Sequence, residues 1–124
     1  MSIPDGASCQ FDPEIRAVGA ARRFAFEIAR QWGAAPHDIV LVVSELAANA
    51  VVHGHTPFTV CLSRHGRTVS IEVFDEHAGP ARRSTVSTEA QSGRGLVIVD
   101  RVATNWGSRP LSEGGKVVWA ELDD

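Results

Sequence analysis

Apolar residues recur at helical spacing in two segments of this 124-residue chain. In the first, Asp12-Pro13-Glu14 predicts a helix start with Asp12 as the N-cap, and the helix is expected to end near Gly33. Its apolar stripe consists of Ile15, Val18, Ala21 or Arg22, Ala25, Ile28 and Ala29, with Phe24 and Trp32 nearby. The second segment predicts a helix from about Pro36 to His53.

Alternating apolar and polar residues predict strands in the rest of the chain. The strands are expected at Ala7–Phe11 (a short edge strand), Phe58–Arg64, Thr68–Asp75, Thr104–Arg109 and Lys116–Leu122. The turn His65-Gly66-Arg67 joins two of them into an antiparallel hairpin with one buried face. Helices that precede hairpins indicate an α+β fold, a two-layer sandwich whose mainly antiparallel sheet is covered by helices on one face.

Between Glu76 and Ser92 the periodicity disappears, which predicts a long and functional or mobile loop. Gly93-Arg94-Gly95 then opens a third helix that runs from Leu96 to about Ala103. Two glycines at a helix start leave backbone N–H groups at the positive end of the helix dipole, where phosphate binds well. The alternative is an ordinary glycine-rich helix start, since a lone Gly-x-Gly is a weak signal.

The composition predicts one domain over residues 1–124, with residues 1–6 frayed. A net charge of −3 without a Lys/Arg cluster argues against a nucleic-acid partner. Cys9 and Cys61 are far apart in sequence and indicate no disulfide framework, as expected of a reducing compartment. Because no signal peptide and no membrane-spanning apolar run are found, we expect a cytoplasmic protein that does not enter a membrane.

Polar residues recur every four positions along the second helix, at Glu45, Asn49 and His53, and therefore share one face. The opposite face is apolar and consists of Ile39, Val43, Leu46 and Ala50, with Val40, Ala47 and Val51. An Asn oxygen can bind Mg²⁺, and a Glu carboxylate can accept a proton from an attacking hydroxyl. The alternative is a solvent-facing stripe, which the spacing alone favours. A zinc site at His53-Gly54-His55 is disfavoured, since no Cys, Asp or Glu cluster accompanies it.

A carboxylate, Asp75, ends an apolar strand and could lie at the mouth of the core. There it could accept a hydrogen bond from an exocyclic amine such as that of adenine, and Gly79 would let a flat base approach the backbone. The alternative is that Asp75 only ends a strand and starts a turn.

The order of these motifs is more specific than any one of them. Glu-x-x-x-Asn-Ala-x-x-His on a helix, a strand followed by Asp-x-x-x-Gly, a loop, and Gly-x-Gly-Leu opening a helix resemble the GHKL ATP-binding superfamily. Within that superfamily, this chain looks most like the small anti-sigma-factor serine-kinase branch in its stand-alone actinobacterial form. The features that carry this likeness are the compact size of the chain and the segments Leu41–Leu46, Asn105-Trp106-Gly107 and Gly115–Trp119. The resemblance covers residues 12–122. The alternative, an unrelated structural α+β domain, would require three ordered motifs to occur by coincidence.

This resemblance implies ATP and Mg²⁺ as cofactors and assigns a role to each motif. Glu45 would be the general base and Asn49 the Mg²⁺ ligand, while Asp75 and Gly79 would contact adenine. The phosphate path would be lined by Gly93, Arg94, Gly95 and Leu96, with residues 80–92 as a lid and His53 either touching the site or capping the helix. The sequence departs from the family pattern at two positions on the adenine side. His77 stands where the first glycine of Asp-x-Gly-x-Gly is expected, and Lys116-Val117, at the start of the last strand, lacks the Thr hydroxyl that many members have there.

The function implied is a protein serine/threonine kinase of the anti-sigma type. It would phosphorylate a small antagonist protein and bind a sigma factor, so that partner switching controls transcription; a homodimer is left open. The rival hypothesis is a non-catalytic module that sequesters its partner and binds ATP weakly or not at all. The two adenine-side departures favour the module, whereas Glu45 and Asn49 favour the kinase. The tryptophans Trp32, Trp106 and Trp119 are expected to be core or interface anchors.

Overall fold

The computed structural model describes residues 5–54, 56–76 and 93–123. The elements follow one another as β1 (Gly6–Phe11), α1 (Arg16–Trp32), α2 (Pro36–Gly54), β2 (Phe58–His65), β3 (Thr68–Asp75), α4 (Gly93–Val102), β4 (Asn105–Pro110) and β5 (Lys116–Asp123). None of the helices in these ranges is long and apolar enough to cross a membrane.

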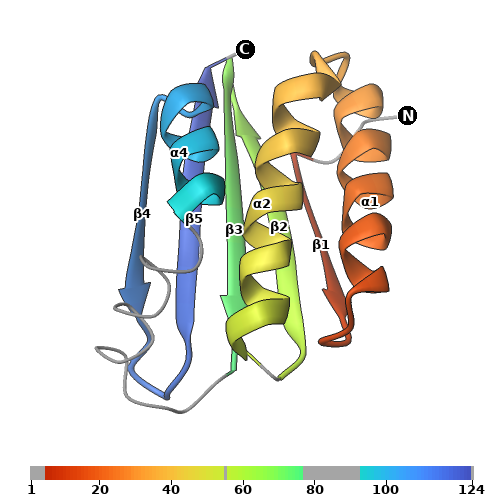
Figure 1. Ribbon diagram of the computed structural model, residues 1–124. Helices are drawn as coiled ribbons and strands as arrows, with labels where there is room; N and C mark the ends of the chain where they lie inside the picture. The colour runs from red at the N-terminus through yellow and green to blue at the C-terminus, as the bar shows by residue number, and fades with distance from the viewer. Residues whose placement is uncertain (1–4, 55, 77–92, 124) are drawn as a thin grey trace.

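The strands form one sheet in the order β1-β2-β3-β5-β4, and every neighbouring pair is antiparallel. Figure 1 shows α1, α2 and α4 side by side on one face of this sheet; among the described residues, no helix lies on the other face. The predicted two-layer α+β sandwich is therefore confirmed, as is the edge position of the first strand.

The alternation in the strands buries one side chain in two against the helices. In β3, Val69, Ile71 and Val73 are buried and belong to the core, together with Leu62 of β2 and Ala120 of β5, which are the register partners of Ile71. Register partners on adjacent strands project to the same face, so these rows form a continuous apolar layer. The hairpin of β2 and β3 has the bounds that its alternation predicts, extended by one residue at His65.

The start of α1 differs from the prediction. Asp12 is not the N-cap: the helix begins at Arg16 after Ile15, whose side chain makes no capping hydrogen bond. The N–H groups of Ala17 and Val18 donate to the carbonyls of Glu14 and Ile15, three residues back, at 2.9 and 3.2 Å. Residues 14–18 thus form a tighter turn at the start of the helix.

The buried stripe of α1 is made mainly of alanines spaced four residues apart, namely Ala17, Ala21, Ala25 and Ala29, with Trp32 at the end. Small side chains allow α1 to lie close to α2, with which it is in extensive contact. Ile15 was placed in this stripe by its spacing, but it precedes the helix and is 81% exposed. The predicted end of the helix at Gly33 is confirmed.

Three connections meet at one end of the sheet. The end of α2, the end of β3 and the turn between β4 and β5 lie together there, at the bottom of Figure 1. The turn between β2 and β3 lies at the opposite end. Since the candidate motifs of the sequence fall on α2, β3 and the start of α4, the first end is where a site would be assembled.

Candidate functional site

The polar stripe of α2 does not face solvent as a whole. Asn49 is only 6% exposed, and Glu45 and His53 are half-buried. Val42, seven residues before Asn49 and thus near it on the helix surface, is fully buried. The solvent-facing alternative is therefore wrong for Asn49, whose carboxamide lies within the fold.

The reason is the position of α2 in the helical layer. It packs against α1 on one side, α4 on the other, and β2, β3 and β5 beneath. Along residues 39–51 every side chain is at least partly buried. An amphipathic pattern on its own treats polar residues as exposed, so it could not reveal that this helix is enclosed on three sides.

Asp75 is the last residue of β3 and is 3% exposed. Its side chain follows the alternation of Ile71 and Val73 and therefore projects to the face covered by the helices. A carboxylate is rarely buried this deeply. The buried position agrees with the predicted place at the mouth of the core rather than with an exposed turn residue.

The first residue of β5 and the last residue of the turn before it both lie beside Asp75. Lys116 is its register partner in β5 and projects to the same face. Gly115, immediately before, has a φ of 83°, and a Cβ built on it would lie 2.2 Å from the Asp75 carbonyl oxygen. In the sequence, Gly115 is notable only as part of the family resemblance, and Lys116 only for the missing hydroxyl. The pairing of β5 with β3, which alternation alone does not specify, is what brings them to Asp75.

Beside Asp75, the described residues border an open recess of about 420 Å³. It is lined by Phe74, Asp75, Glu76 and the β4–β5 turn residues Leu111, Ser112, Glu113 and Gly114. Carboxylates repel phosphate groups but accept hydrogen bonds from amines. The described lining therefore suits a group that donates hydrogen bonds better than it suits a phosphate.

The glycine motif forms the first turn of α4, with Gly93, Arg94, Gly95 and Leu96 all in helical backbone. In Figure 1 this first turn is directed toward the end of the sheet at which α2 ends. The first four N–H groups of a helix have no partner within it and can bind an anion. Gly79, His77 and the predicted lid at residues 80–92 lie outside the described residues.

The tryptophans and cysteines take structural positions. Trp32 is buried, Trp106 packs on the core and donates from Nε1 to Asp100 Oδ1 at 2.9 Å, and Trp119 lies on the uncovered face. Both cysteines are free and half-buried. Over the ranges 5–54, 56–76 and 93–123, no three His, Cys, Asp or Glu side chains gather as a metal site requires.

Comparisons with family models and with solved structures both give matches. A family model described as the histidine kinase-like ATPase domain matches residues 11–122. Among solved structures, the histidine kinase AdeS of Acinetobacter baumannii is similar, with a TM-score of 0.56 and 14% sequence identity over 94% of this chain and 67% of that one. At this identity the structural match shows a common fold. A search of curated protein sequences found no match.

Proposed function

This chain belongs to the histidine kinase-like ATPase family, and on that premise we propose that it is an ATP- and Mg²⁺-dependent serine/threonine protein kinase of the anti-sigma-factor type. It would phosphorylate a small antagonist protein and bind a sigma factor. One observation carries the proposal: Asn49 and Asp75, which the motif order assigns to Mg²⁺ and adenine, are the two polar residues buried within the described part of the chain.

The chemistry of each residue suits its proposed role. The side-chain oxygen of Asn49 is a hard ligand for Mg²⁺ and carries no charge of its own. The Asp75 carboxylate accepts a hydrogen bond from the six-amino group of adenine. Glu45 lies one helical turn before Asn49 and is only half-buried, so its carboxylate can accept the proton of an incoming hydroxyl.

Bound MgATP would supply the phosphoryl group, and the chain would position and neutralise it. In phosphoryl transfer, positioning and charge stabilisation account for most of the catalysis. The backbone N–H groups at the start of α4 add a fixed positive potential for phosphate oxygens.

The second candidate is a partner-binding module of the same fold that binds ATP weakly. Lys116 and Val117 favour it, since neither offers the hydroxyl expected near the start of β5. The long Lys116 side chain projects to the face on which Asp75 lies and takes up space there. Loss of the Glu45 carboxylate separates the two candidates because it affects only catalysis.

Calorimetric titration with MgATP tests the metal assignment. Asn49→Ala should weaken MgATP binding by about ten- to hundredfold, since one contact with a charged group contributes roughly 1.5–3 kcal/mol. Asn105→Ala, at an exposed asparagine of β4, is the matched control and should bind as the wild type does. Equal affinity of Asn49→Ala and wild type would refute the role of Asn49, and no binding by wild type would refute ATP dependence.

Transfer of label from ATP to a candidate antagonist protein tests the reaction. Glu45→Ala should retain MgATP binding but lose about 10²–10⁴-fold in transfer rate, the usual contribution of a general base. Ser44→Ala, at the preceding half-buried residue of α2, is the control. If wild type binds MgATP but labels no antagonist, the binding-module function is favoured.

A further inference from the structure

The turn between β4 and β5 ends at Gly115, which lies so close to the Asp75 backbone that a side chain at this position would clash with it. Gly115 lies in the left-handed region, with φ 83°, where side chains are rarely tolerated. A Cβ on Gly115 would meet Asp75 O at 2.2 Å, Asp75 C at 3.2 Å and Glu76 Cα at 3.2 Å. Contacts this short with backbone atoms can be relieved only if one of the two strands moves.

The Asp75–Glu76 segment is held from other directions as well. Phe58, the register partner of Asp75 on β2, is fully buried. The Glu76 N–H donates to the Thr56 hydroxyl at 3.2 Å, which ties the end of β3 to the loop after α2. Gly115 therefore closes one side of a clamp whose other sides are Phe58 and Thr56.

We propose that Gly115 is a positioning residue that fixes the Asp75 carboxylate for recognition of an adenine amino group. This rests on the proposed ATP binding and goes further, since it assigns base selectivity to a glycine that offers no side chain to the base. Any residue with a Cβ at position 115 would displace the Asp75 backbone and move its carboxylate away from the amine. Binding of the phosphates, at the start of α4, would be little affected.

Two glycine positions allow backbone strain to be separated from displacement of Asp75. Gly66, in the turn between β2 and β3, has φ 62°, but a Cβ there would meet no atom within 4 Å. It lies at the opposite end of β3 from Asp75. Gly66→Ala thus carries comparable left-handed strain without the contact, and Gly115→Asn carries the contact with a residue that tolerates this backbone region better than alanine.

The experiment measures the affinity of each variant for MgATP and for the magnesium complex of purine riboside triphosphate, which lacks only the six-amino group. Wild type should prefer ATP by about ten- to hundredfold, the usual effect of a hydrogen bond to a charged group. Gly115→Ala and Gly115→Asn should lose most of this preference through weaker ATP binding, as should Asp75→Ala. Gly66→Ala should keep the wild-type ratio. Thermal unfolding of every variant accompanies the titrations.

Each other result is decisive. A wild-type ratio in folded Gly115→Ala or Gly115→Asn would overturn the proposal while ATP binding stands. If both Gly115 variants fail to fold and Gly66→Ala folds, Gly115 serves folding and the positioning role is refuted. If wild type binds both nucleotides equally, Asp75 does not read the amine and the proposal is overturned. If wild type binds neither, ATP binding itself is refuted.

Discussion

The two ends of the sheet enclose polar side chains in different surroundings. At the end with Gly66, Arg64 donates from Nη1 to the Trp32 carbonyl at 2.8 Å and lies over the Trp32 ring, 5.4 Å from its centroid. Its Nη2 is 3.7 Å from Asp5 Oδ1, and its backbone N–H donates to the Asp5 carbonyl at 2.8 Å. These contacts join the end of α1, the start of β1 and β2, so this cation serves the fold.

At the other end, Asp75 is more deeply buried than Arg64 but borders an open recess of about 420 Å³. Carboxylates are seldom buried this deeply, and a buried carboxylate beside an open recess is a candidate for ligand binding. The contacts of Arg64 are therefore structural, whereas we propose that the Asp75 end serves recognition. Substitutions of Arg64 and of Asp75 should accordingly separate stability from nucleotide affinity.

The largest effect is expected from Phe58→Ala, at the Asp75 end. Phe58 is fully buried, stacks on Phe11 at 5.5 Å between ring centroids and is the register partner of Asp75. Its truncation should lower the free energy of unfolding by about 3–5 kcal/mol. Chemical denaturation measures this loss.

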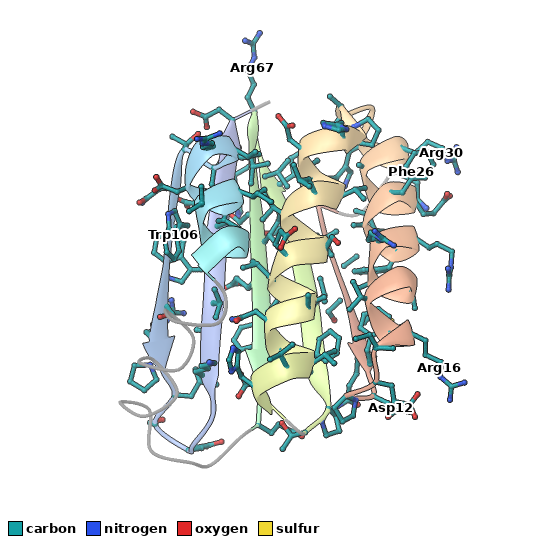
Figure 2. All side chains as sticks on the ribbon, viewed as in Figure 1. Asp12, Arg16, Phe26, Arg30, Arg67 and Trp106 are labelled. Carbon is teal, nitrogen blue, oxygen red and sulfur yellow. The ribbon has the colours of Figure 1, made fainter. Side chains whose placement is uncertain are left out.

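The control for Phe58→Ala is Phe26→Ala. Phe26 lies half-exposed on the outer side of α1 (Figure 2), and its loss should change stability by about 0.5 kcal/mol or less. Equal losses for the two phenylalanines would mean that the core does not extend to the Asp75 end, and the clamp around Asp75 would lose its rigid side.

A smaller effect is expected from Arg64→Ala, at the structural end. It removes a hydrogen bond from a charged donor and a cation–π contact, and should lower the free energy of unfolding by about 2–3 kcal/mol. MgATP affinity should not change, since Arg64 lies at the far end of the sheet from Asp75. Denaturation and calorimetry on the same sample measure both quantities.

Arg67→Ala is the matched control, because this arginine projects away from the molecule at the hairpin turn (Figure 2). It should leave both stability and affinity unchanged. If Arg64→Ala instead weakened MgATP binding as much as Asn49→Ala does, the two ends would not be independent and the division of roles would be wrong.

Much of this architecture follows from the sequence because periodicity reports burial. The alternation in Thr68–Asp75 predicts the bounds of β3 without error, because the side chains that face the helices are buried and those on the opposite face are only partly buried. The second helix was predicted to within one residue for the same reason. The burial of its polar residue Asn49 was not predicted, because this burial depends on α1 and α4, which come from other parts of the chain and pack on either side of α2.

The candidate site divides in a similar way. Residue types and their order identify Asn49 and Asp75 as candidates, and the fold buries both. The approach of Gly115 and Lys116 to Asp75 could not be predicted, because it depends on how β5 pairs with β3. Asp75 and Lys116, which are register partners, are separated by forty residues in the sequence. The roles of Glu45, Gly79 and the first turn of α4 stay predictions until nucleotide binding is measured.

The smallest effect concerns the uncovered face, between the two ends. Cys61 lies there opposite Glu72, and burial, followed by the Glu72 carboxylate, raises the pKa of its thiol. In a Cys9→Ser background, alkylation by iodoacetamide should therefore reach half its maximal rate at a higher pH than for free cysteine, and Glu72→Gln should lower that midpoint. Because the pKa of Cys61 is higher in the folded protein than in the unfolded chain, the contribution of this thiol to stability is complete below the unfolded pKa. That contribution is lost as the pH rises through the folded pKa.

MgATP at the Asp75 end, on the opposite face, should not slow the alkylation of Cys61. Protection by MgATP would place nucleotide on the uncovered face and refute the assignment of recognition to Asp75.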